Sequence, residues 1–205
     1  MARDHDEEAV KLVERSYNKI YKRYDERRSG NKKEVKELAR LLPKGSQVLD
    51  VGCGSGYITG LLVKEGFAVT GVDISENMLK LAKKNVPKAK FYRMDMRKLN
   101  LRRNSFNAIT SMYAIIHVPR KYQPGIFKEF NALLKSKGFL LVSVGRTPLA
   151  GEIEENWLGA KMYWSQFGIK KDLQLIRKAG FKVLWHRLVG SKNDKCPIVL
   201  AQKAS

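Results

Sequence analysis

Two amphipathic helices are predicted at the start of the chain. Apolar residues recur at steps of three and four along residues 7–28, which is the spacing of one buried helix face. A second stripe of this kind covers residues 35–42. Asn31 stands three residues before Glu34 and predicts a variant of the capping box at the start of the second helix. Residues 1–45 are therefore expected to form a helical cap.

From residue 46 onward, short apolar runs alternate with helical stripes. The runs cover residues 48–51, 68–72, 91–92, 108–112 and 139–144. Strands separated by helices predict a parallel sheet built from βαβ units. Continuous apolar strands fit a sheet that is covered on both faces. The fold class expected for this part of the chain is α/β.

The C-terminal part of the chain shows a different pattern. Residues 146–168 contain several aromatic side chains without clear periodicity and are expected to form a lid or substrate segment. A helix that ends at Gly180 and a pair of strands are predicted within residues 169–205. The two strands, near 183–185 and 198–201, are joined by a connection too short for a helix, so they should pair antiparallel.

Charge and composition narrow the possible classes. The 205 residues favour one domain, and 40 Lys and Arg against 20 Asp and Glu give a net charge of +20. Such a net charge attracts polyanions such as RNA, but a solvated lysine-rich surface is the favoured explanation. With two cysteines, a disulfide framework is excluded, and no spacing suggests a metal site. Neither a secretory signal nor a transmembrane segment is recognised, so a cytoplasmic location is expected.

The strongest chemical signal is a glycine-rich turn after the first predicted strand. Asp50 is followed by Gly52, Gly54 and Gly56 at alternate positions, and a helix is predicted beyond them. Glycines permit positive φ and let a ligand lie against the bare backbone. The dinucleotide pattern G-x-G-x-x-G would need its third glycine where Tyr57 stands, so a dinucleotide site is disfavoured.

Two more carboxylates follow neighbouring strands. Asp73 ends the second predicted strand, where an acidic residue can accept hydrogen bonds from both hydroxyls of a ribose. Asp95 lies between Met94 and Met96 and can accept a hydrogen bond from the amino group of an adenine, with the methionines against the ring. These residues predict an adenosine site at the carboxyl ends of the strands.

In order and spacing, Asp50-x-Gly52-x-Gly54-x-Gly56, Asp73 and Asp95 resemble the class I S-adenosylmethionine-dependent methyltransferases. The segment 111–118 is similar to the fourth-strand region of their small-molecule branch, which includes the ubiquinone/menaquinone-biosynthesis type. The resemblance covers residues 46–145, the cofactor-binding core of a single methyltransferase domain. It implies a Rossmann-like, seven-stranded, mostly parallel sheet with helices on both faces and the last strand antiparallel. It also implies S-adenosylmethionine as the cofactor.

The resemblance also implies roles for single residues. Asp50 and the glycine-rich backbone would hold the methionine part of the cofactor, Asp73 the ribose, and Asp95 the adenine. Met112 and Tyr113 would face the methyl donor. The full set of expected cofactor-binding residues is Asp50, Gly52, Cys53, Gly54, Ser55, Gly56, Asp73, Ile74, Met78, Asp95, Met96, Met112 and Tyr113.

Candidates for catalysis and acceptor binding are less specific. His117 is a candidate general base for a hydroxyl or amine acceptor; the alternative is a histidine that only hydrogen-bonds a loop. Tyr17 is assigned to helix packing. Tyr24 is also assigned to helix packing, with a place at the cofactor and substrate as the alternative. Aromatic side chains that form either a core patch or, as we favour, the wall of a substrate pocket are Trp157, Tyr163, Trp164 and Phe167.

Three functions remain open on the sequence alone. A small-molecule methyltransferase is favoured, because the later segments resemble that branch and no added RNA-binding module is recognised. A tRNA or rRNA methyltransferase would use the basic surface for phosphate contacts. The third is a non-catalytic scaffold that binds the cofactor. Clustering of Lys and Arg around the cofactor mouth would favour RNA, whereas an even spread would favour a small molecule.

Overall fold

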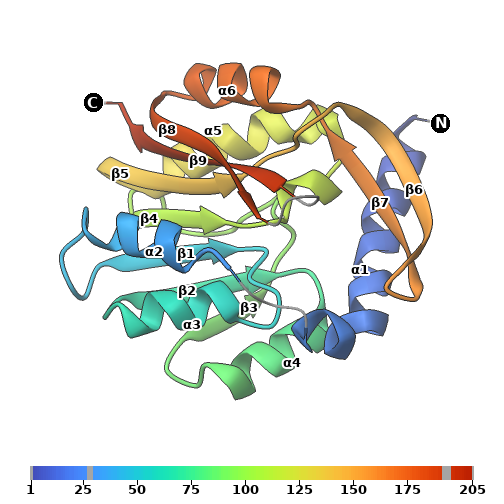
Figure 1. Ribbon diagram of the computed structural model, residues 1–205, viewed down its shortest axis with the longest axis horizontal. Helices are drawn as coiled ribbons and strands as arrows, with labels where there is room; N and C mark the ends of the chain where they lie inside the picture. The colour runs from blue at the N-terminus through green and yellow to red at the C-terminus, as the bar shows by residue number, and fades with distance from the viewer. Residues whose placement is uncertain (1, 27–29, 191–194, 205) are drawn as a thin grey trace.

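A seven-stranded sheet forms the centre of the molecule. The computed structural model describes residues 2–26, 30–190 and 195–204, and its strands lie in the order β3-β2-β1-β4-β5-β9-β8 (Figure 1). They are β1 (Gln47–Val51), β2 (Ala68–Asp73), β3 (Lys90–Arg93), β4 (Phe106–Ser111), β5 (Leu134–Ser143), β8 (Phe181–Gly190) and β9 (Lys195–Lys203). Strands β1 to β5 run parallel, and β9 is antiparallel to both of its neighbours. The expected sheet and its antiparallel last strand are confirmed.

Helices cover both faces of this sheet. They are α1 (Ala2–Glu26), α2 (Lys32–Ala39), α3 (Tyr57–Lys64), α4 (Glu76–Asn85), α5 (Gln123–Leu133) and α6 (Ile169–Lys178), with short 3₁₀ turns η1 (Ile115–His117) and η2 (Arg120–Tyr122). Leu49 of β1 belongs to a core cluster with Phe127 of α5 and Ile176 of α6. Its neighbour Val48 belongs to a second cluster with Leu38 of α2. Because successive strand residues point to opposite faces, the two clusters are the two sides of one sheet.

Residues 146–168 contain an antiparallel hairpin made of β6 (Leu149–Trp157) and β7 (Ala160–Gln166). This hairpin lies beside α1, and Met162 of β7 is buried in one cluster with Ile20 of α1 (Figure 1). Strand β6 is almost entirely exposed, so it lacks the alternation that would have predicted it. The expected lid segment is therefore a regular hairpin that is held by the N-terminal helix.

Local end signals are confirmed in part. Ser75 caps α4 by accepting a hydrogen bond from the N–H of Met78 at 3.2 Å, and Gly180 follows α6 with φ 89°. The capping box at Asn31 is wrong, because this residue adopts φ 57° and its side chain makes no capping hydrogen bond. The first helix ends at Glu26 where the structure describes it, and residues 27–28 of the prediction lie outside the described residues. In the described part of the chain, no helix is long and apolar enough to cross a membrane.

Candidate cofactor and acceptor site

The glycine-rich loop follows β1 and adopts backbone angles that favour glycine. Gly52, Gly54 and Gly56 have φ values of 70°, 53° and 86°. A Cβ atom on Gly52 would lie 2.3 Å from the Cβ of Ala114, so packing forbids a side chain there. On Gly54 a Cβ would meet only the Tyr24 ring, at 3.8 Å. The bare backbone of Gly54 therefore leaves room for the close approach of a ligand.

Asp73 connects this loop to the start of α4. Its carboxylate accepts hydrogen bonds from the N–H of Gly54 and from the N–H of Ser75, each at 2.8 Å. Burial raises the pKa of Asp73, and these backbone donors oppose the rise. A carboxylate has about four acceptor positions, so Asp73 keeps acceptor capacity toward the cavity that it lines. This geometry fits the diol of a ribose.

Asp50 is a buried carboxylate of β1, directly before the glycine-rich loop. It is 1% exposed and accepts hydrogen bonds from the hydroxyls of Thr59, at 2.6 Å, and Thr110, at 2.8 Å. Burial raises the pKa of Asp50 to about 6. Each carboxylate oxygen thus already has a partner, one on α3 and one on β4. Direct contact between Asp50 and the methionine part of a cofactor stays a prediction.

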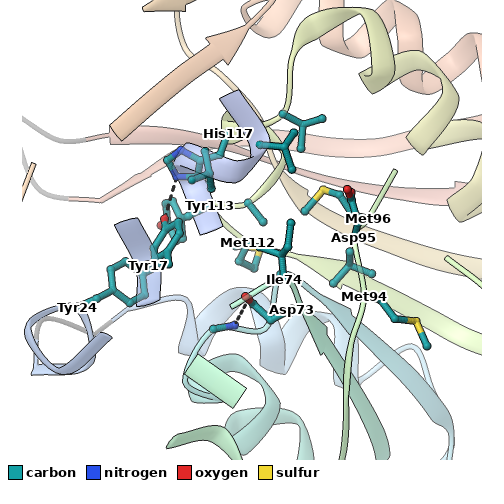
Figure 2. A pocket seen from close by; sticks show the side chains of 17 residues that line it. Tyr17, Tyr24, Asp73, Ile74, Met94, Asp95, Met96, Met112, Tyr113 and His117 are labelled. Carbon is teal, nitrogen blue, oxygen red and sulfur yellow. Dashed lines mark hydrogen bonds between the residues drawn. The ribbon is translucent and has the colours of Figure 1, made fainter. Parts of the chain in front are cut away.

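An inner cavity opens at the carboxyl ends of β2, β3 and β4. It is lined by Asp73, Ile74, Met94, Asp95, Met96, Met112 and Tyr113, and it is covered by Val10, Val13 and Tyr17 of α1 (Figure 2). The structure thus brings Asp73 and Asp95 together with Met94, Met96 and Met112, whereas Asp50 does not line this cavity. Met78, which was also expected at the cofactor, is 1% exposed in the core and lines neither this cavity nor the outer one described below.

Asp95 has a partner that the sequence analysis missed. Its carboxylate lies 2.7 Å from the guanidinium of Arg97, which also contacts Glu7 of α1 at 2.7 Å. Asp95 therefore helps, through Arg97, to hold α1 in place over the inner cavity. The expected contact with an adenine stays a prediction.

His117 is buried between α1 and the hairpin. Its Nδ1 lies 2.9 Å from the carbonyl oxygen of Tyr163, and its Nε2 lies 2.9 Å from the hydroxyl of Tyr17. A carbonyl only accepts, so Nδ1 carries the proton and Nε2 accepts the Tyr17 proton. Burial lowers the pKa of His117 to about 4. A neutral imidazole with both nitrogens engaged supports the alternative to a general base, a histidine that holds its neighbours in place.

Five rings, the His117 imidazole among them, form one cluster. Neighbouring centroids lie 4.6 Å apart for His117 and Trp164, and 5.4 Å apart for Tyr17 and Tyr24. Trp157 contacts Tyr17 with centroids 5.8 Å apart. Tyr17 lines both cavities, so its assignment to helix packing alone is wrong. Tyr163 lines neither cavity, and its part in the site is the carbonyl that holds His117.

An outer cavity of about 880 Å³ extends from the glycine-rich loop to the hairpin. Its volume is within the range of small-molecule sites. Trp157 and Trp164 form part of its wall, as does Tyr24. The lysine, arginine, aspartate and glutamate residues in its lining are Arg146, Lys195, Glu152, Glu154 and the buried Asp50. Among the described residues, no group of three His, Cys, Asp or Glu side chains is arranged to hold a metal ion.

Comparisons with known proteins agree with this arrangement. Residues 48–138 match the family described as a methyltransferase domain. A ubiquinone biosynthesis O-methyltransferase of Coxiella burnetii is 36% identical over 104 residues, which cover 49% of this chain and 44% of that protein. The chain spans about half the length of the curated relatives that match it in this way.

Solved structures share the fold. A putative S-adenosylmethionine-dependent methyltransferase from Listeria monocytogenes has a TM-score of 0.70 at 20% identity, covering 84% of this chain and 98% of its own. The 1,6-didemethyltoxoflavin-N1-methyltransferase of Burkholderia thailandensis, solved with 1,6-didemethyltoxoflavin and S-adenosylhomocysteine, has a TM-score of 0.65 at 19% identity, covering 85% of this chain and 80% of its own. Residues 48–138 thus match a methyltransferase domain, and the fold around them is similar to that of solved S-adenosylmethionine-dependent methyltransferases.

Proposed function

We propose that the chain transfers the methyl group of S-adenosylmethionine to a small molecule bound in the outer cavity. The cofactor supplies a methyl group that its sulfonium makes electrophilic. The protein's task is to hold an acceptor in line with that methyl group and to exclude water. Asp73 and the Gly54 backbone would hold the cofactor, and the aromatic side chains of the outer cavity would hold the acceptor.

One observation carries this proposal. The inner and outer cavities share Tyr17, Tyr24, Gly52, Gly54, Met112, Tyr113 and His117. The space beside the ribose-binding candidate Asp73 therefore adjoins the space beside Trp157 and Trp164. Methyl transfer between a ligand in the inner cavity and a ligand in the outer one needs such adjacent positions.

The charges of the outer cavity favour a small molecule over RNA. Two basic residues, Arg146 and Lys195, are accompanied there by three acidic ones, Glu152, Glu154 and Asp50. An enzyme that binds a nucleic acid backbone needs a surplus of cations where the strand enters. RNA remains the second candidate because the whole chain carries a net charge of +20.

Transfer of radiolabelled methyl groups to a cell extract tests the proposal. The products are separated into low-mass, protein and RNA fractions, with and without ribonuclease. The Asp73→Ala variant controls for methyltransferases that copurify. Label in the low-mass fraction that requires the wild-type chain is the expected result. Label in ribonuclease-sensitive material would replace the proposal with RNA methylation, and cofactor binding without transfer to any fraction would indicate a scaffold.

A further inference from the structure

The hydrogen bonds around His117 fix the direction of the Tyr17 hydroxyl. His117 Nδ1 donates to the Tyr163 carbonyl, so His117 Nε2 can only accept, and Tyr17 donates to it at 2.9 Å. Burial raises the pKa of Tyr17 well above its usual value, so the phenol keeps its proton. Because this bond uses the only proton of the Tyr17 hydroxyl, the oxygen can act toward any other group only as an acceptor.

Tyr17 lies where the two cavities meet. It is one of the residues that line both, together with Met112 and Tyr113 at the end of β4. Figure 2 shows Tyr17 and His117, joined by their hydrogen bond, on the opposite side of the inner cavity from Asp95 and Met96. A methyl group that leaves a cofactor in one cavity for an acceptor in the other must pass this junction.

We infer that the Tyr17 oxygen faces the methyl-sulfonium group and makes the site prefer the positively charged cofactor to its neutral product. The inference rests on the proposed function. Carbon-bound hydrogens next to a positive charge are electropositive and interact with an oxygen acceptor. The thioether of S-adenosylhomocysteine has neither the methyl group nor the charge. His117 is then a positioning residue, because it holds the Tyr17 proton away from the junction.

The neutrality of His117 fits this role. A protonated imidazole beside the junction would repel a sulfonium and would no longer accept the Tyr17 proton. Burial lowers the pKa of His117 to about 4, which keeps the ring neutral near pH 7. The Asp73 carboxylate also lines the inner cavity, and its negative charge likewise favours a cation there.

Calorimetric titration with S-adenosylmethionine and S-adenosylhomocysteine tests the inference without any acceptor. Tyr17→Phe should weaken S-adenosylmethionine binding about two- to fivefold, the size of one weak hydrogen bond, and leave S-adenosylhomocysteine binding unchanged. The matched control is Tyr21→Phe, which removes the same hydroxyl from the same helix outside both cavities. Equal effects of Tyr17→Phe on the two ligands would overturn the inference.

A second variant separates this role from a structural one. His117→Phe removes the acceptor of the Tyr17 proton. The Tyr17 hydroxyl can then point its proton into the junction, so the preference for S-adenosylmethionine should again fall. Damage to packing alone would lower both affinities together and would count against the inference. If the wild-type chain binds neither ligand, the proposed function itself fails, which is distinct from a wild-type chain that binds both without a Tyr17 effect.

Discussion

Gly54 donates its backbone N–H to the carboxylate of Asp73 at 2.8 Å. The glycine-rich loop after β1 and the acidic end of β2 are therefore one structural unit. Ser75 completes it by donating its own N–H to the other oxygen of Asp73. A ligand that bonds to Asp73 thus meets a carboxylate whose orientation is already set, which lowers the entropy cost of binding.

Asp73→Ala should weaken cofactor binding. The change removes acceptors for the ribose hydroxyls and also releases the Gly54 loop. Hydrogen bonds to a charged group contribute about 1.5–3 kcal/mol, so the dissociation constant of S-adenosylhomocysteine should rise roughly 10- to 150-fold by calorimetry. Glu76→Gln, an exposed carboxylate at the start of α4, is the control and should change nothing. Unaltered affinity in Asp73→Ala would refute the ribose assignment.

Gly54→Ala should affect both stability and binding. An L-residue at a φ of 53° costs about 1–2 kcal/mol, and the new methyl group enters the space where a ligand would lie. Gly125→Ala is the comparison, because that helical position has no atom within 4 Å of an added Cβ and should gain about 0.5–1 kcal/mol. Urea unfolding and S-adenosylhomocysteine titration measure the two effects. Normal binding by Gly54→Ala would show that the ligand does not approach this backbone.

The fold could be predicted from the sequence where burial is complete on both faces. The adjacent residues Val48 and Leu49 are both fully buried, because their strand is covered on both faces. This is why a continuous apolar run correctly predicted a central parallel strand. The glycine-rich loop and the position of Asp73 at the end of its strand could also be predicted, because each depends on local backbone geometry. The hairpin at 149–166 was not readable, since β6 exposes both of its faces and shows no alternation.

The missed parts of the site depend on contacts between distant segments. Tyr17 and His117 are 100 positions apart, and Glu7 and Arg97 are 90 apart. Nothing in the local pattern at Tyr17 distinguishes a ring that covers a cavity from one that packs a helix. The pairing of Asp95 with Arg97 had a local signal, the cation two residues later, and that signal also suits an ordinary surface pair.

Asp172 should make stability fall as the pH rises. This carboxyl is 2% exposed, one of its oxygens has no hydrogen-bond partner, and burial raises its pKa to about 7. Between the unfolded pKa of 3.8 and about 7, the folded state binds more protons than the unfolded state, so deprotonation costs stability over that window. Asp172→Asn should raise the melting temperature at pH 8 by about 2–12 °C, because a buried carboxylate with an unpaired oxygen costs about 1–3 kcal/mol of stability. The gain should vanish near pH 4, and a gain that persists there would contradict the assignment.

His117 should make stability fall on acidification. Burial lowers its pKa in the folded state to about 4, below the ordinary value of 6.5, so the folded state binds fewer protons between these two pH values. His117 therefore contributes up to about 3 kcal/mol to the free energy of unfolding above pH 6.5, and this contribution is lost as the pH falls toward 4. The unfolding free energy of the wild type minus that of His117→Phe should shrink over this window in urea titrations. A constant difference would mean that His117 is not buried as a neutral ring. Because Asp50 and Asp172 titrate in the opposite sense there, the difference between the two proteins is the quantity to compare.

A crystal structure of the chain with S-adenosylhomocysteine would test the central claim most directly. The arrangement predicts the ribose on Asp73, the adenine near Ile74 and Met96, and the sulfur at the junction beside Tyr17. The outer cavity should remain open beyond the sulfur, toward Trp157 and Trp164. A ligand bound elsewhere, or one whose sulfur points away from the outer cavity, would contradict both the cofactor assignment and the proposed route to the acceptor.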